Sequence, residues 1–324
     1  MQRGLYSAQG MKLKGCCVMK KRLFSALLVA LLFCGMVTPV SAENGQEENA
    51  AKMLYTLGLF KGTGTNPDGT PIFDLDKTPT RDQAVIMLIR LLGKEDEALA
   101  GTWEIPFTDV SESMRPYVGY AHANGLTNGT SATTFGGTNT IKSTHYVVFV
   151  LRALGYKDGE DFQWDTAWQF AEEINLNLRG TYTASSNFNR GDVAILSRNA
   201  LVLPLKNSNV RLIERVCDKP LNPDIPITEN SFCFFYPYPD DTFGDINLNG
   251  WAHGNPHSKR EYTLIINGSI VKDGYTVECS ADGFCDDIDI LDDGRFLVYA
   301  PRQGQETIFV TYAGVTANFI FISF

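Results

Sequence analysis

The feature that most constrains this sequence is a pattern that occurs three times before residue 206. The copies span about residues 46–93, 107–155 and 161–205. Each copy contains an amphipathic stretch, a loop rich in Gly, Asn and Thr, a phenylalanine, and a second apolar stretch. Because a single helix–loop–helix of this size cannot bury its apolar face alone, the copies are expected to pack together as one all-α bundle.

The second stretch of the first two copies has the period of an α-helix. Apolar residues between 85 and 92 fall on one helical face, and so do those between 147 and 154. Gly93 and Gly155 follow these stretches as C-terminal stops. Thr80 precedes the first of the two helices, where its hydroxyl suits an N-cap.

The pattern changes near residue 205. Prolines at 204, 220, 223 and 226 mark a linker, assigned to residues 206–228. Residues 229–324 then hold about six or seven short runs rich in aromatic and β-branched residues, separated by turn residues. This spacing predicts a small all-β sandwich that ends in a hairpin. The fold class is therefore expected to be multidomain α + β.

The first 42 residues have the composition of a secretory signal peptide. Basic residues at 20–22 precede an apolar run from Leu23 to Val37, and small residues follow at Ser41 and Ala42. The alternative is a membrane anchor, but the run is shorter than the roughly 20 apolar residues that span a bilayer. We expect cleavage after Ala42, export, and no membrane contact afterwards. Residues 1–18 precede Met19, an alternative start.

The charge balance excludes one class of partner. Residues 1–42 hold six of the 28 Lys and Arg and no acidic residue, which leaves 22 basic and 37 acidic residues, a net charge of −15. Such a chain has no electrostatic reason to bind nucleic acid. Binding of an anionic glycan would need local, directed arginines rather than overall charge.

The part expected to remain after cleavage has four cysteines, Cys217, Cys233, Cys279 and Cys285. An even number in an exported chain permits disulfides, and four cysteines allow three connectivities. Cys279 and Cys285 flank a turn-like stretch, which favours this pair, although the sequence leaves the other pairings open.

Three short motifs resemble the S-layer homology family. They are the Phe-Thr-Asp-Val opening at 107–110, the Asn-Gly-Leu-x-x-Gly turn at 124–129, and Thr80-Arg81 at the start of a helix. The resemblance covers about residues 46–205. It implies a three-lobed helical bundle that attaches non-covalently to a secondary cell-wall polymer, with the glycan, often one bearing a pyruvate ketal, in grooves between the lobes.

In this family the arginine of a Thr-Arg-Ala-Glu motif binds the acidic group, and its planar guanidinium matches a carboxylate. The first copy has this motif at residues 80–83, and the third copy keeps the arginine at residues 189–192. The second copy, residues 142–145, has Ser143 at the arginine position. The resemblance therefore implies one or two working grooves. Its glycan-binding candidates are Arg81, Arg190, Thr80 and Lys142. The alternative for the arginines is a surface residue that pairs with a nearby acid.

Enzymatic signatures are missing from the sequence. It contains no His-Glu-x-x-His pair and no Gly-x-Ser-x-Gly elbow. His253 and His257 flank a loop and make a poor metal pair. The acidic run at 286–293 fits a solvated turn better than a calcium site. No catalytic activity, cofactor or resident metal is therefore expected.

The C-terminal part loosely resembles bacterial immunoglobulin-like modules, on the string from Gly294 to Phe319. Earlier in the C-terminal part, Phe232, Phe234 and Tyr236 alternate along an expected strand, which favours a core face over a sugar platform. The expected role is an exported surface protein that displays this β-domain. The alternative is a wall-anchored glycan-processing hydrolase with an unrecognised C-terminal active site.

Overall fold

The computed structural model describes residues 41–177, 187–235, 251–254, 259–280, 287–299 and 304–323. The chain forms two compact units, Met1–Asn44 and Gly45–Phe324. The expected signal peptide, residues 1–42, lies outside the described residues except for its last two positions. Within the described ranges, no helix is long and apolar enough to cross a membrane.

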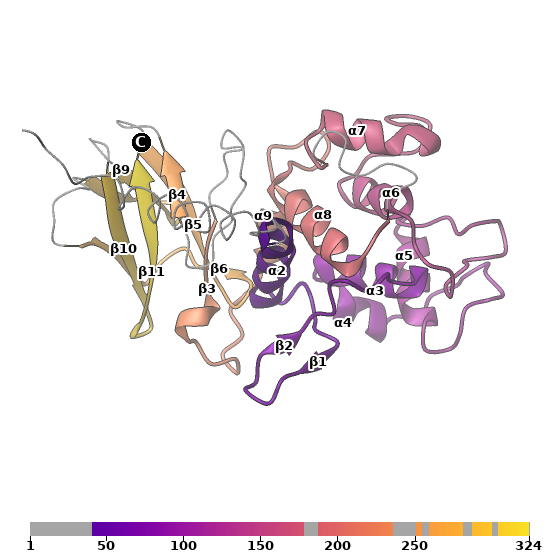
Figure 1. Ribbon diagram of the computed structural model, residues 1–324, viewed down its shortest axis with the longest axis horizontal. Coiled ribbons are helices and arrows are strands. Elements are labelled where there is room, and N and C mark those ends of the chain that lie inside the picture. The colour runs from indigo at the N-terminus through magenta and orange to yellow at the C-terminus, as the bar shows by residue number, and fades with distance from the viewer. Residues whose placement is uncertain are drawn as a thin grey trace, which may run out of the picture. The chain divides into compact units, whose positions relative to one another are not determined.

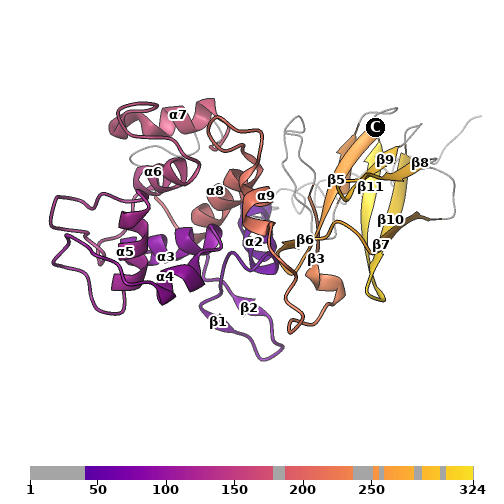
Figure 2. The same cartoon turned by 180° about the vertical axis from the view of Figure 1, so that it is seen from behind.

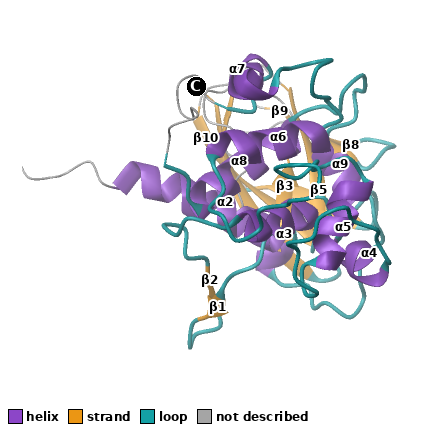
Figure 3. Cartoon of the chain, turned by 90° about the vertical axis from the view of Figure 1, so that its right-hand side faces the viewer, coloured by secondary structure: helices purple, strands orange, loops and turns teal. Residues whose placement is uncertain are grey.

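Helices come first along the chain (Figure 1). They are α2 (Ser41–Thr56), α3 (Arg81–Leu91), α4 (Glu95–Ala100), α5 (Arg115–Ala123), α6 (Ser143–Ala153), the 3₁₀ helix η1 (Trp164–Thr166), α7 (Ala167–Glu173), α8 (Arg190–Val202) and α9 (Leu212–Cys217). A short hairpin of β1 (Gly64–Thr65) and β2 (Pro71–Ile72) projects from the helices (Figure 3).

Strands and one further 3₁₀ helix, η2 (Glu229–Ser231), follow. The strands are β3 (Phe232–Phe235), β4 (Trp251–Gly254), β5 (Lys259–Ile266), β6 (Ser269–Ile270), β7 (Tyr275–Cys279), β8 (Asp287–Ile290), β9 (Arg295–Tyr299), β10 (Gly304–Tyr312) and β11 (Val315–Ser323). One sheet has the order β4-β11-β10-β7 and the other β3-β5-β9-β8, with β6 paired to β5 (Figure 2). The expected final hairpin is confirmed as β10 and β11, which pair antiparallel.

The chain is thus a mixed α and β protein, with helices before strands, as expected from the change of pattern near residue 205. The finer assignments, a bundle of three repeats and an immunoglobulin-like sandwich, stay predictions, as do the domain boundaries.

One corner recurs in all three copies. The second residue after the first helix of each copy has a positive φ, of 72° at Gly58, 69° at Gly125 and 61° at Asn175. In each copy the next residue, a leucine, donates its backbone N–H to a carbonyl five residues earlier, at 2.8 Å. This bond caps the helix with a left-handed residue, a conformation that glycine adopts without steric cost and asparagine tolerates.

Both faces of strand β3 are buried. Phe232 and Phe234 belong to the apolar core that the two sheets share, which confirms the core face expected from their alternation. Cys233 and Phe235 point the other way and are buried in the core of the helical part. Tyr236, the third residue of the expected face, lies outside the described residues.

The segment 206–228, expected as a linker, contains helix α9. Its Leu212, Ile213, Val216 and Cys217 are buried in the helical core. Prolines flank this segment and indicate a linker, yet residues 212–217 have a short apolar pattern of helical period. This part of the expected linker is therefore folded against the preceding helices.

The cysteines divide into two kinds. Cys279 is disulfide-bonded, whereas Cys217 and Cys233 are free thiols with no exposed surface. Burial raises the pKa of Cys217 to about 12 and raises that of Cys233 further. The favoured pairing of Cys279 with Cys285 cannot be traced, because Cys285 is not among the described residues.

Gly125→Ala tests the recurring corner. A Cβ at Gly125 would meet no atom within 4 Å, so the substitution adds only backbone strain at a φ of 69°. We expect a loss of about 1 kcal/mol in the free energy of unfolding, measured by urea denaturation. Gly45→Ala is the matched control, because Gly45 lies in helix α2, also has open space, and should not be destabilised. Equal midpoints for the two variants would contradict the argument.

Candidate functional site

The first turns of α3 and α8 are built alike. Each has a capping box, in which the N-cap side chain accepts the backbone N–H three residues later and the side chain there accepts the N-cap N–H. The pairs are Thr80 with Gln83 and Asn189 with Asp192. The Thr80 hydroxyl, a predicted glycan contact, is therefore committed to holding the start of α3.

Each of these helix starts also docks onto a loop of another copy. The backbone N–H of Arg81 donates to Asn139 O at 2.8 Å, which joins the first copy to the second. The backbone N–H of Arg190 donates to Lys77 O at 3.0 Å, which joins the third copy to the first. The residue after each arginine makes a second such bond, at 2.9 Å. The two motif arginines thus occupy equivalent places between copies.

The Phe-Thr-Asp-Val opening fixes the loop that receives Arg81. Both carboxylate oxygens of Asp109 accept backbone N–H groups, from Phe135 and Gly136, at 2.8 Å. Phe107 packs so closely on Gly129 that a Cβ there would lie 2.4 Å from its ring. This motif is therefore a clamp for the loop between residues 129 and 136.

The Arg81 guanidinium is buried between the first two copies and makes few hydrogen bonds. Its side chain is 6% exposed, and Nη2 donates to Thr127 Oγ1 at 3.2 Å. The guanidinium lies 5.0 Å from the ring centre of Phe135 and 4.8 Å from that of Phe149. Nε is buried and has no partner among the described residues. Much of its hydrogen-bonding capacity is left for another acceptor.

The surroundings of Arg81 are positively charged. Burial and the charge of Arg152 lower the pKa of Arg81 to about 10, so the guanidinium stays charged at neutral pH. The pKa of His145 is lowered by burial and by the charges of Arg81 and Lys142. Arg152 itself pairs with Asp158. An anion in this groove would relieve repulsion among these cations.

Arg190 differs from Arg81 in its partners. Nε donates to Phe73 O at 2.8 Å, Nη2 donates to Lys61 O at 3.3 Å, and Nη1 lies 3.5 Å from Met87 Sδ. The guanidinium also lies 5.2 Å from the ring centre of Phe60. Its donors are used to hold the first copy's loop against α8, so this arginine is a brace between copies.

One difference between the two arginine sites is the residue two positions after each recurring corner. It is Phe60 beside Arg190, Thr127 beside Arg81, and Asn177 in the third copy. A threonine hydroxyl gives the guanidinium one hydrogen bond, whereas a phenylalanine ring covers its face. At the middle position Ser143 is 1% exposed and carries no charge.

Arg81 and the predicted Lys142 thus both lie near His145, whereas Arg190 and Thr80 make hydrogen bonds within the protein. The part of these four residues in glycan binding stays a prediction. Sequence reasoning missed Phe149 and Arg152. Both lie on the face of α6 that begins at His145, at spacings of four and seven residues, which is a signal that helical periodicity offers.

The candidate metal ligands named from the sequence lie in the C-terminal part of the chain, far from Arg81 in the sequence. Across the described ranges, no three His, Cys, Asp or Glu side chains are grouped so as to hold a metal ion. The side chain of His253, all of His257 and Asp286 lie outside what the structure describes.

Comparison with known proteins finds one family profile and several similar proteins. The S-layer homology domain profile matches residues 106–142. A "Cell surface protein" of Thermoanaerobacter kivui is 29% identical over 187 residues, 56% of this chain and 23% of the relative. A "Middle cell wall protein" of Brevibacillus brevis is 28% identical over 200 residues, 58% of this chain and 18% of the relative. A "Surface layer protein" of Brevibacillus choshinensis is 25% identical over 261 residues, 77% of this chain and 22% of the relative.

The chain spans less than a quarter of the length of these relatives. These similarities place the protein at the bacterial cell surface, and residues 106–142 are similar to an S-layer homology domain.

Arg190→Met tests the brace. Methionine keeps the apolar stem but leaves the carbonyls of Phe73 and Lys61 without this donor. We expect a loss of about 2–3 kcal/mol in the free energy of unfolding by urea denaturation. Arg115→Met is the control, because Arg115 is an exposed arginine whose acidic neighbour Glu112 is 4.0 Å away, and it should change stability by less than about 0.5 kcal/mol. Equal stability of the two variants would exclude a bracing role.

Proposed function

We propose that this protein attaches non-covalently to the cell wall by binding an acidic secondary cell-wall polymer in the groove beside Arg81. The observation that carries the proposal is the Arg81 guanidinium, which is held between two copies with its Nε unpartnered among the described residues. A buried cation with unused donors is stabilised by an anionic acceptor.

The ligand group best matched to this groove is a carboxylate, such as that of a pyruvate ketal on a sugar. A carboxylate offers two oxygens to the planar guanidinium fork. The neighbouring Arg152 and Lys142 add positive charge, although the chain as a whole is acidic. Recognition would therefore be local, and the overall charge would disfavour unspecific binding to wall anions.

The two motif arginines support one principal groove rather than two. Arg190 uses its donors on backbone carbonyls, so it has less to offer a ligand than Arg81. The middle position has Ser143 in place of an arginine. Lys142, exposed at the N-cap of α6, would assist from the rim.

The β-part would serve for display or interaction rather than for catalysis. The relatives are named as surface, wall and surface-layer proteins, which favours a structural role. A wall-anchored glycan hydrolase remains the second candidate, and it would require convergent carboxylates in a pocket of the β-part.

Arg81→Gln tests the anchor. The purified protein is sedimented with sacculi of the producing bacterium, before and after chemical removal of the secondary polymer. We expect wild-type binding to disappear on removal of the polymer, and Arg81→Gln to weaken binding to intact sacculi at least about tenfold. Binding should also weaken with salt, since it depends on charge.

Arg115→Gln is the matched control and should bind as the wild type does, because Arg115 lies at the exposed start of α5. Thermal melting of each variant separates loss of binding from loss of folding. Undiminished binding by a folded Arg81→Gln protein, or wild-type binding that survives removal of the polymer, would refute the proposal.

A further inference from the structure

The second copy, which has Ser143 at the position of the motif arginine, presents a different kind of surface. Trp164, in η1 at the start of the third copy, is 53% exposed, the highest value among the exposed large apolar side chains of the described residues. Trp103, by contrast, is partly buried and donates its indole N–H to Ala98 O at 2.8 Å. An indole left in water at this position has no role in the core.

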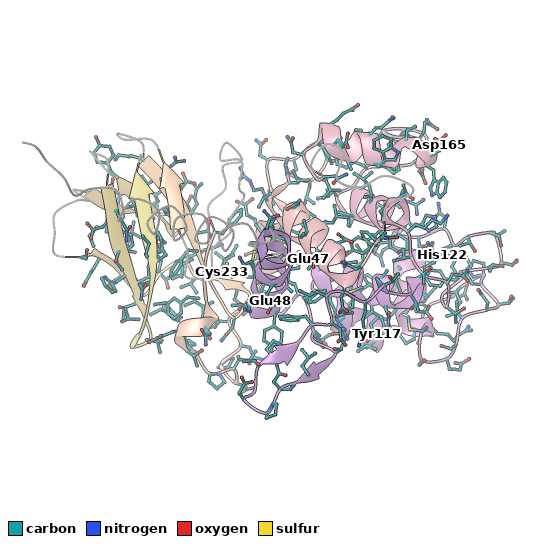
Figure 4. The ribbon with its side chains drawn as sticks, viewed as in Figure 1. Glu47, Glu48, Tyr117, His122, Asp165 and Cys233 are labelled. Atoms are coloured by element: carbon teal, nitrogen blue, oxygen red, sulfur yellow. The ribbon has the colours of Figure 1, made fainter. Side chains whose placement is uncertain are left out.

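Trp164 is held against a polar ring from the second copy. Its ring centre lies 5.5 Å from that of His145, at an interplanar angle of 40°. His145 lies in the first turn of α6, two residues after Ser143. Asp165, the neighbour of Trp164, marks this place at the outer edge of the helical part (Figure 4). Together the two rings form a surface with an apolar face and an imidazole edge.

His145 links this surface to the neighbourhood of Arg81. The charges of Arg81 and Lys142 both act on the His145 ring, so the three groups are close neighbours. These charges, with burial, lower the pKa of His145, which therefore keeps a neutral imidazole near pH 7. A neutral imidazole both donates and accepts one hydrogen bond, which suits a hydroxyl group better than a carboxylate.

We propose that Trp164 and His145 form a second glycan subsite, which takes an uncharged pyranose of the polymer next to the acidic residue held by Arg81. The C–H face of the sugar would stack on the indole, and its hydroxyls would bond to the imidazole edge. With Ser143 in place of a motif arginine, the second copy would thus offer a neutral sugar site where the first copy offers an anion site. This inference rests on the proposed function.

The test uses calorimetric titration of the purified full-length chain with two probes. One is a methyl glycoside of N-acetylglucosamine, and the other is the same glycoside carrying a pyruvate ketal. We expect Trp164→Ala to weaken binding of the uncharged probe roughly fivefold, as loss of one aromatic contact implies. Arg81→Gln should weaken binding of the ketal probe alone.

Leu99→Ala is the matched control, since Leu99 is a 51% exposed apolar residue on α4. This variant should bind both probes as the wild type does. His145→Ala should reproduce the loss for the uncharged probe. If Arg81→Gln weakens the ketal probe while Trp164→Ala changes neither, the subsite is refuted and the anchor stands. If neither variant changes binding of either probe, both proposals fail.

Discussion

The first backbone N–H groups of α3 and α8 have no partner inside their own helices, as at any helix start. Here they donate to carbonyls of a loop in another copy, at Asn139 and Lys77. The same bonds that complete each helix therefore join the copies to one another. They also fix where the side chain of the first helical residue goes, which is into the space between copies. The placement of Arg81 and Arg190, and with it the candidate chemistry, depends on this docking.

Equivalent positions do not give equivalent roles. Arg81 and Arg190 start their helices in the same way, yet different side chains meet them. Thr127 accepts a hydrogen bond from Arg81, whereas the ring of Phe60 lies against Arg190. Carbonyls of the first copy's loop reach Arg190 and occupy its donors, whereas the loop clamped by Asp109 leaves the Nε of Arg81 without an acceptor among the described residues. The guanidinium of Arg190 is therefore stabilised by the protein, whereas that of Arg81 would, under the proposed function, be stabilised by a bound anion. The arginine that the protein satisfies less completely is the better candidate for function.

The helical part and the strands are less separate than the proline-rich segment between them suggests. Helix α9 and one face of β3 are buried in the same core, and Ser269 Oγ donates to Pro220 O at 3.1 Å. Strand β3 thus has a different neighbour on each face. Its two faces carry side chains of the same apolar character, so alternation located the sheet core but could not show that the opposite face was covered as well.

Periodicity, turn residues and the repeat determined much of this protein from sequence alone. They predicted the helix that follows Thr80, the apolar helix at residues 147–154, their glycine stops at 93 and 155, and the final hairpin, because each depends on neighbours within a few residues. Only the tertiary structure decided which arginine keeps free donors, that Arg152 and His145 lie near Arg81, and that α9 is folded. Those outcomes depend on contacts between residues far apart in the sequence, such as Arg81 with Thr127, 46 positions apart, and Arg190 with Phe73, 117 positions apart. No local pattern records which carbonyl a buried guanidinium will meet.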